Sequence, residues 1–327
     1  MAEPKVVAGP MRRLRDHALR YWKRARNAKS PGLFVARLLG RPLPDRLYMQ
    51  IGHRFFFGFW PDFERPQTLS ENIMSYILRG RDPLLKVAAD KVRARQYVAE
   101  RVGQKYLVPL YGVWERADDI PLETLPRPCV LKPAAASGLV TFLRPGVEVD
   151  LDNLREVLRN WLRLDYSRNH REWSYQGIKQ RILAEKMLVE PDGQPPADYK
   201  LWVIGNKVRM ITVDRDRFTQ RTRNVYRANW DQVDARQYPA GNHPADSRPP
   251  QIDLMIEVAE HLAAPFEFLR VDCYLNGDDS LYVGELTVSP GAGYERFEPA
   301  SLERELGGYW PPLSASRNAR DTPSPAL

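Results

Sequence analysis

The stretch LRVDCYLNGDDSLYVGELTVSPGAG, residues 269–293, holds two apolar runs separated by the polar turn NGDDS. Each run contains one carboxylate, Asp272 in the first and Glu285 in the second. Apolar runs rich in β-branched and aromatic residues around a polar turn are typical of a β-hairpin. A buried carboxylate costs several kcal/mol unless it is paired or bound to a cation. The stretch therefore predicts a hairpin whose strands hold a cation.

A turn at Asn276–Ser280 would place Asp272 and Glu285 on adjacent strands, with both side chains on one face. Mg²⁺ prefers few protein carboxylates, together with phosphate oxygens and water. The hairpin therefore predicts a site for a metal–phosphate complex.

Three more charged residues interrupt strand-like apolar runs: Lys132 in VLKPAAASG (130–138), Glu185 in ILAEKML (182–188) and Lys200 in DYKLWVIG (198–205). Two lysines can neutralise a polyphosphate, and the small residues after Lys132 let backbone N–H groups approach phosphate oxygens. The pattern GxxxxGK[ST] is absent, so this loop is not a P-loop.

The rest of the chain alternates helix and strand patterns. Helices are predicted over 68–80, 90–103, 152–166 and 251–266, strands over 106–114, 127–134, 139–144 and 179–188, and a second hairpin over 199–216 with its turn at Gly205–Asn206. The aromatic run HRFFFGFW (53–60) is expected to pack in a core, although a membrane or ligand surface is the alternative.

Of the net charge of +8, the first thirty residues supply +7, from nine Lys/Arg and two acids, so the remaining 297 residues are about neutral. A nucleic-acid enzyme would more often carry its charge on the folded body. Neither a spanning apolar run nor a signal-peptide core is found, so a cytoplasmic location is expected. The two cysteines, Cys129 and Cys273, are expected to be reduced core residues. The basic arm is either a solvated segment or an adhesive for an anionic membrane surface.

The order of these motifs resembles a known family. RVD (270–272) followed by GELTVSPG (284–291) resembles the closing signature of the ATP-grasp superfamily. Residues from about 65 to 312 more narrowly resemble the TupA-like ATP-grasp proteins of bacterial polysaccharide and teichuronopeptide gene clusters. The segments that support this are 81–98, 107–114, 130–138, 170–188, 197–226 and 268–297.

The resemblance implies an α+β chain with the ATP-grasp fold, in which two α+β lobes grip ATP behind a helical, aromatic N-terminal region. The implied division is a basic arm at 1–30, an N-terminal region at 31–126, a small lobe at 127–190, a large lobe with the metal site at 191–312, and a disordered tail at 313–327.

The resemblance also implies roles for individual residues. Lys132 and Lys200 would contact ATP phosphates under a loop that includes Ser137 and Gly138. Arg270 would stabilise charge on the transferred phosphoryl group or the acyl intermediate. The remaining ligands would be Glu185, Lys186 and Met187 for adenosine, and Asp272, Glu285 and Thr287 for Mg²⁺.

Three positions depart from the family pattern. Ala134–Ala136 stand where Asn-His usually precedes the loop glycines, Thr287 replaces the common asparagine after the metal glutamate, and Arg221 stands where a histidine is frequent. These changes affect, in the same order, the polar contacts of the loop, the binding of a second Mg²⁺ and the choice of substrate.

The charged run VDRDRFTQRTR offers a second cluster. Asp214, Asp216, Arg217 and Arg223 would form either a substrate site, in which arginines hold a carboxylate bidentately, or an ion-pair network at a strand end.

The function implied by the resemblance is an ATP-dependent carboxylate–amine ligase that works through an acyl phosphate. Its substrates would be an amino acid or amine and a carboxylate of surface-polysaccharide biosynthesis. A kinase of a hydroxyl substrate and a degenerate ATP-grasp scaffold are the alternatives.

Overall fold

The computed structural model describes residues 43–167, 171–190, 193–216, 220–277 and 280–312. The chain divides into two compact units, residues 1–62 and 63–327. The predicted basic arm (1–30) and tail (313–327) lie outside the described residues.

The described part of the first unit contains helix α3 (Asp45–Phe57), which ends at Gly58 with a φ of 89°. His53 is buried and its ring stacks on Phe57 at 4.5 Å between centroids. Phe55 and Trp60 are 51% and 63% exposed. The expectation that the aromatic run packs in a core is therefore wrong for these two side chains.

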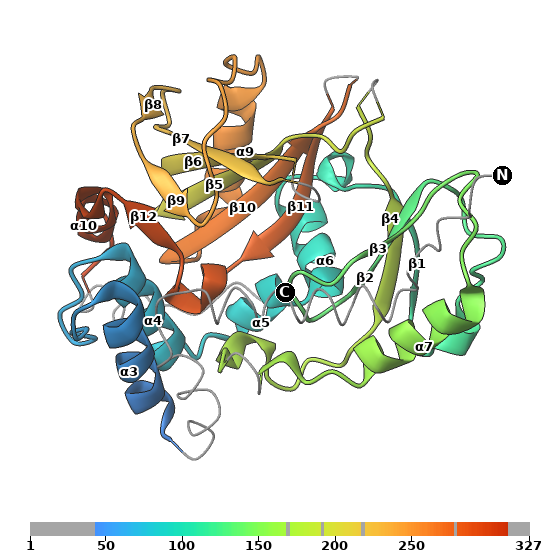
Figure 1. Ribbon diagram of the computed structural model, residues 1–327, viewed down its shortest axis with the longest axis horizontal. Coiled ribbons are helices and arrows are strands. Elements are labelled where there is room, and N and C mark those ends of the chain that lie inside the picture. Colours follow the sequence, from blue (N-terminus) through green and yellow to red (C-terminus); the bar gives the residue numbers. More distant parts are fainter. Residues whose placement is uncertain (1–42, 168–170, 191–192, 217–219, 278–279, 313–327) are drawn as a thin grey trace, which may run out of the picture. The chain divides into compact units, whose positions relative to one another are not determined.

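A six-stranded antiparallel sheet dominates the second unit, in the order β11-β10-β5-β6-β7-β8 (Figure 1). Its strands are β5 (Asp198–Ile204), β6 (Lys207–Arg215), β7 (Thr222–Tyr226), β8 (Gln232–Val233), β10 (Phe268–Leu275) and β11 (Leu281–Thr287). Both predicted hairpins are confirmed as the pairs β5–β6 and β10–β11. Gly205 and Asn206 turn the first with positive φ angles, which an Asn–Gly type of pair adopts readily.

A smaller sheet has the order β1-β4-β2-β3 and is also antiparallel. Its strands are β1 (Leu110–Trp114), β2 (Cys129–Pro133), β3 (Thr141–Leu143) and β4 (Ile182–Lys186). Helix α7 (Leu151–Leu162) packs its Leu154, Leu158 and Trp161 into the same core as Cys129. Because β1 comes from the predicted N-terminal region, the small sheet extends across the predicted division at residue 126.

Helices and short strands complete the unit. They are α4 (Leu69–Arg79), α5 (Pro83–Ala89), α6 (Lys91–Arg101), α9 (Ile252–Ala263), α10 (Ala300–Gly308), β9 (Arg236–Tyr238) and β12 (Arg296–Glu298), with 3-10 turns η1 (Gln104–Tyr106), η2 (Ala117–Asp119), η3 (Trp173–Tyr175) and η4 (Pro290–Gly293). Helix α4, predicted over 68–80, begins with a capping box in which Thr68 and Glu71 satisfy each other's backbone N–H groups.

Several predicted boundaries move. The strand expected over 106–114 begins at Leu110, because η1 occupies 104–106. The helix expected over 152–166 ends at Leu162, and the strand expected over 179–188 is the shorter β4. Helix α5 and strands β7, β8, β9 and β12 have no counterpart in the sequence prediction.

The two faces of the large sheet differ in chemistry. Helix α9 packs on β10, β5 and β6, where it meets alternating apolar residues such as Leu201 and Val271 (Figure 1). With a side-chain period of two, the neighbours Lys200 and Asp272 point to the opposite face. That face is where the charged residues of the hairpins meet.

Candidate functional site

A row of polar side chains crosses the large sheet. Glu285 on β11 pairs directly with Asp272 on β10, which pairs with Lys200 on β5, which pairs with Thr212 on β6. Directly opposite residues in an antiparallel sheet share a face, so these side chains form one row. The prediction that Asp272 and Glu285 lie side by side is confirmed.

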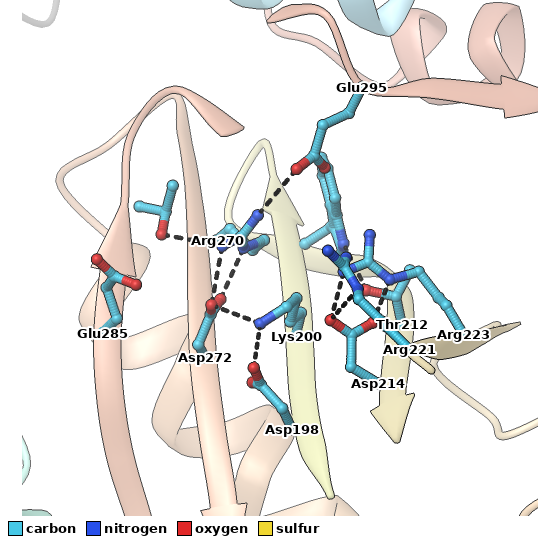
Figure 2. A network of polar contacts seen from close by, with 12 residues as sticks. Asp198, Lys200, Thr212, Asp214, Arg221, Arg223, Arg270, Asp272, Glu285 and Glu295 are labelled. Carbon is cyan, nitrogen blue, oxygen red and sulfur yellow. Dashed lines mark hydrogen bonds and ion pairs between the residues drawn. The ribbon is translucent and has the colours of Figure 1, made fainter. Parts of the chain in front are cut away.

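Asp272 is the centre of this row (Figure 2). It is 1% exposed and accepts hydrogen bonds from Lys200 Nζ at 2.8 Å and from Arg270 Nε and Nη2 at 2.7 and 2.8 Å. Burial alone would raise the pKa of Asp272, but Arg270 and Lys200 outweigh it and hold the pKa well below the usual value. Asp272 therefore stays ionised and fixes both cations.

The two cations have further partners. Lys200 is 3% exposed and also donates to Asp198 at 2.5 Å. Arg270 donates to the hydroxyl of Thr287 at 3.2 Å and lies 3.7 Å from Glu295. Lys200 and Arg270 thus stand on the sheet face in fixed positions.

Glu285 forms an ion pair with a lysine of helix α6. Lys91, the first residue of α6, places its Nζ 3.1 Å from Glu285 Oε1 and donates to the carbonyl of Ala136 at 2.5 Å. The backbone N–H of Lys91 also donates to the carbonyl of Ala134. Burial tends to raise the pKa of Glu285, but Lys91 lowers it to below the usual value. Lys91 therefore links the expected metal ligand to the loop after Lys132.

That loop leaves β2 toward solvent. Ala134–Ala136 are buried, whereas Ser137 and Gly138 are exposed. Gly138 has a φ of 75°, a conformation in which a side chain would be strained. Ser137 and Gly138 are thus open to a ligand, as the phosphate-loop prediction requires.

A second ion cluster lies on the small sheet. Glu185 forms ion pairs with Lys132 and with Arg95, the latter at 2.7 Å. Arg95 also donates to the carbonyl of Val108 at 2.7 Å. The N–H groups of Lys186 and Met187 donate to the carbonyls of Pro109 and Pro128, so neither N–H is open to a nucleotide.

Asp214 on β6 and Arg223 on β7 form a second buried network on the large sheet (Figure 2). Asp214, 1% exposed, accepts two hydrogen bonds from Arg223 and lies 3.1 Å from Arg221. The third nitrogen of Arg223 donates to Gln237. Burial would raise the pKa of Asp214, but Arg223 lowers it to about 2.

This geometry favours the network interpretation for Asp214 and Arg223, because every nitrogen of that guanidinium has a partner. Arg221, whose side chain is 42% exposed, is better placed to meet a substrate. Asp216 is exposed, and Arg217 lies outside the described residues.

The donors present fit Mg²⁺. Two carboxylates on paired strands, next to a hydroxyl at Thr287, are the oxygen ligands this ion takes together with phosphate oxygens and water. Within the described residues, no group of three His, Cys, Asp or Glu side chains comes together. The arrangement therefore suits an ion whose remaining ligands would come from a substrate, and Glu285, which is paired with Lys91, would have to give up that partner to hold it.

Sequence reasoning missed several contributors to the site: Lys91, Arg95, Asp198, Gln237 and Glu295. Asp198 could have been predicted from the sequence, because it lies two residues before Lys200 and its side chain is therefore on the same face of the strand. Lys91 and Arg95 follow the helix cap Asp90 by one and five residues, but only the folded chain brings α6 to both sheets.

Comparison with known proteins adds the family. A family model described as TupA-like ATPgrasp matches residues 71–310. No curated protein matches the chain.

Three solved structures are among those that match the chain. The ADP complex of the N5-carboxyaminoimidazole ribonucleotide synthetase purK is 16% identical with a TM-score of 0.37, over 63% of this chain and 46% of that one. The L-amino acid ligase from Bacillus licheniformis is 13% identical with a TM-score of 0.43, over 77% and 56%. The ATP-grasp ligase PsnB with a phosphomimetic variant of its minimal precursor, Mg and ADP is 12% identical with a TM-score of 0.39, over 73% and 65%. The chain thus spans about half the length of the first of these structures.

Proposed function

Because this chain belongs to the TupA-like ATP-grasp family, we propose that it is an ATP- and Mg²⁺-dependent carboxylate–amine ligase that produces ADP. The observation on which the proposal depends is the pairing of Asp272 with Glu285, beside the buried cations Lys200 and Arg270. Such a face can hold a polyphosphate with its metal ion and neutralise charge that develops during phosphoryl transfer.

In the proposed reaction, a substrate carboxylate oxygen attacks the γ-phosphorus of ATP and the bond to ADP breaks, which gives an acyl phosphate. An amine then forms a C–N bond with the acyl carbon, phosphate leaves with the electron pair of the C–O bond, and the nitrogen loses a proton. No protein nucleophile is needed, because positioning and charge neutralisation supply the catalysis.

Individual residues have separate roles in the proposed reaction. Lys132 and Lys200 contact the phosphates, and Ser137 and Gly138 cover them. Arg270 stabilises charge on the transferred group. Asp272, Glu285 and Thr287 would hold Mg²⁺, which offsets phosphate charge when bound.

The nucleotide base is proposed to bind beside β4, where Lys186 and Met187 follow Glu185. Glu185 is paired with both Lys132 and Arg95, which supports a second role for it as the counter-ion that positions Lys132.

The substrates are proposed to be an amino acid or other amine and a carboxylate of bacterial surface-polysaccharide or teichuronopeptide-type biosynthesis, acted on at the cytoplasmic side. The basic arm (1–30) would hold the enzyme at the anionic inner face of the membrane. Among the described residues, no helix is both long enough and apolar enough to cross a bilayer.

A degenerate scaffold is the second candidate, because Asp272 and Glu285 are already paired with protein cations. The ligase and the scaffold differ in ligand binding. A scaffold has no need to replace Lys91 by a metal ion at Glu285, and it binds no Mg²⁺–nucleotide.

The test is thermal unfolding with Mg²⁺ and the non-hydrolysable analogue AMPPNP. Wild type at about 100 times the dissociation constant should gain roughly 2.7 kcal/mol. Lys132→Met should lose most of this gain, whereas Lys179→Met, an exposed lysine paired with Glu115, should keep it. No Mg²⁺-dependent shift in wild type would support the scaffold. If wild type binds Mg²⁺–AMPPNP, the next measurement is ADP release with pairs of acids and amines. A phosphoester product in that assay would instead identify a kinase.

A further inference from the structure

One buried carboxylate near the site has no role in the scheme above. Glu172, immediately before η3, is 5% exposed, and its Oε2 accepts a hydrogen bond from the hydroxyl of Ser289. Ser289 follows Thr287 by two residues, just beyond the end of β11. Glu172 therefore lies against the segment that continues directly from the expected metal strand.

Glu172 differs from the other carboxylates of the site in its partners. Asp198, Asp272, Asp214 and Glu285 each form an ion pair with a lysine or arginine. Across the described residues, no ion pair includes Glu172, and the neutral Ser289 is its hydrogen-bond partner. A carboxylate without a cation can take up and release a proton instead of holding a fixed charge.

Tyr175 connects Glu172 with the reaction centre. Burial raises the pKa of the Tyr175 phenol, Glu172 and then Glu285 raise it further, and Arg270 lowers it. The phenol of Tyr175 is therefore within electrostatic reach of Glu172, of an expected metal ligand and of the arginine proposed to stabilise the acyl intermediate.

The surroundings of Ser289, the hydrogen-bond partner of Glu172, are largely apolar. A small cavity beside Ser289 is lined mainly by Tyr76, Ile77, Leu85, Trp173 and Val288. Lys86 and Arg81 lie over the Trp173 ring, at 4.4 and 5.5 Å from its centroid. Neither contributes to the ionisation of Glu172, which depends on burial and on Ser289.

The proposed aminolysis has a requirement that none of the paired residues meets. An alkylamine has an ordinary pKa near about 10, so at neutral pH it arrives as an ammonium ion with no free electron pair. It must lose protons to become a nucleophile and to leave a neutral amide. A carboxylate already engaged with an arginine or lysine is a poor acceptor, because its pKa is depressed.

We propose that Glu172 is the general base that accepts a proton from the acceptor amine as the amine attacks the acyl phosphate. The inference rests on the ligase function proposed above. In this step a carboxylate oxygen of Glu172 takes one proton from the ammonium group, which frees the nitrogen electron pair. That pair forms the C–N bond, the C–O bond to phosphate breaks with its electron pair on the phosphate, and the second nitrogen proton leaves with the phosphate. Ser289 is a positioning residue that orients that carboxylate.

The ionisation of Glu172 suits this role. Burial raises its pKa from 4.5 to about 7, against a smaller lowering by the Ser289 hydrogen bond. A general base is most effective when its pKa lies near the working pH. The rate of amide formation should therefore rise with pH through about 7.

The test separates acyl-phosphate formation from amine transfer. Wild type and Glu172→Gln are incubated with ATP, Mg²⁺ and a panel of acids, namely the twenty amino acids, glucuronate and galacturonate. The acceptor is either hydroxylamine, which is largely neutral at pH 7, or one of two primary amines, ethanolamine and lysine. Hydroxamate and amide products are measured separately from pH 6 to 9.

Glu172→Gln should lower amide formation by about 10²-fold or more and abolish its rise through pH 7, because a general base contributes about 10²–10⁴. Hydroxamate formation and the AMPPNP thermal shift should stay within a few-fold of wild type. Glu303→Gln is the matched control, since burial also raises the pKa of Glu303 to about 7 but its carboxylate accepts from the N–H groups of Ser70 and Phe297. Glu303→Gln should behave as wild type in both assays.

Unchanged amide formation in Glu172→Gln, or an equal loss of amide and hydroxamate, would overturn the role of Glu172 and leave the ligase function standing. Absence of hydroxamate from wild type with every acid would overturn the ligase function itself, and the general base with it.

Discussion

Two groups of buried carboxylates in this protein have opposite ionisation. Asp272 and Asp214 lie on the charged face of the large sheet, and arginines and Lys200 hold their pKa values low. Glu172 and Glu303 are comparably buried, yet the pKa of each is raised to about 7. Burial acts in the same direction on all four, so the difference comes from the partner, which is a cation in the first group and a hydroxyl or backbone N–H in the second.

The difference has a functional consequence. A carboxylate with a fixed charge can anchor cations and share a metal ion with a phosphate. A carboxylate that titrates near neutrality can move a proton. The protein keeps the first kind on the strands β10 and β6 and the second kind outside the large sheet, at Glu172 before η3 and at Glu303 in α10.

The largest effect is expected from Asp272→Asn. Removing this charge leaves Arg270 and Lys200 buried without their shared anion, and breaking a buried ion pair costs about 3–5 kcal/mol. Urea unfolding should show this loss, and the Mg²⁺-dependent AMPPNP shift should disappear. Asp253→Asn, at a 77% exposed carboxylate paired with Arg248, should change stability by under about 1 kcal/mol. A loss in Asp272→Asn as small as in this control would contradict the anchoring role.

A smaller effect, with a distinct pH dependence, is expected from Glu172→Gln. Between pH 4.5 and about 7 the folded protein keeps a proton on Glu172 that the unfolded chain has lost, so the free energy of unfolding of wild type falls as pH rises through this range. A shift from 4.5 to about 7 corresponds to about 3 kcal/mol.

Glutamine removes this penalty. The stability of Glu172→Gln relative to wild type should therefore increase by roughly 3 kcal/mol between pH 4.5 and 8, measured by urea unfolding at several pH values. Asp272→Asn should show no such gain on raising the pH, because the pKa of Asp272 is lowered. A pH-independent difference for Glu172→Gln would mean that Glu172 titrates at its ordinary value.

The smallest effect is expected from Lys91→Met, which takes a cation away from Glu285. A hydrogen bond to a charged group contributes about 2 kcal/mol, and this contact is partly exposed. The pKa of Glu285 should rise, because burial is then opposed only by the more distant Arg270. Carbon-13 NMR of glutamate-labelled protein would measure it, with Glu285→Gln to assign the signal. Lys207→Met, whose side chain is 64% exposed beside Glu260, is the control and should leave this signal in place.

Much of the local structure could be predicted from the sequence. The alternation of charged and apolar residues around two polar turns predicted both hairpins, and it placed Asp272 and Glu285 on one face. The helix predicted over 68–80 agrees closely with α4, which is capped by Thr68. Both cysteines are buried and free, as expected. Each of these features depends on residues close in sequence or on one hairpin pairing.

The remaining boundaries depend on neighbours that a single segment does not reveal. Tyr106 and Leu107 have the composition of a strand, but η1 bends the chain there before β1 pairs with β4 at Leu110. The short strands β9 and β12 exist because they pair with each other across some sixty residues. Neither has an apolar pattern long enough to be found alone.

The sequence by itself thus determined the two hairpins, the pairing of Asp272 with Glu285 and the residue types that a phosphate and metal site needs, because side-chain alternation and turn chemistry act over a few residues. Only the tertiary structure decided which charges meet. Lys91 reaches Glu285 across 194 positions, Arg95 reaches Glu185 across 90, and Ser289 rather than a cation faces Glu172 across 117. Since the pKa of a buried carboxylate depends on its nearest partner, the fold also decided which acids stay charged and which one can accept a proton.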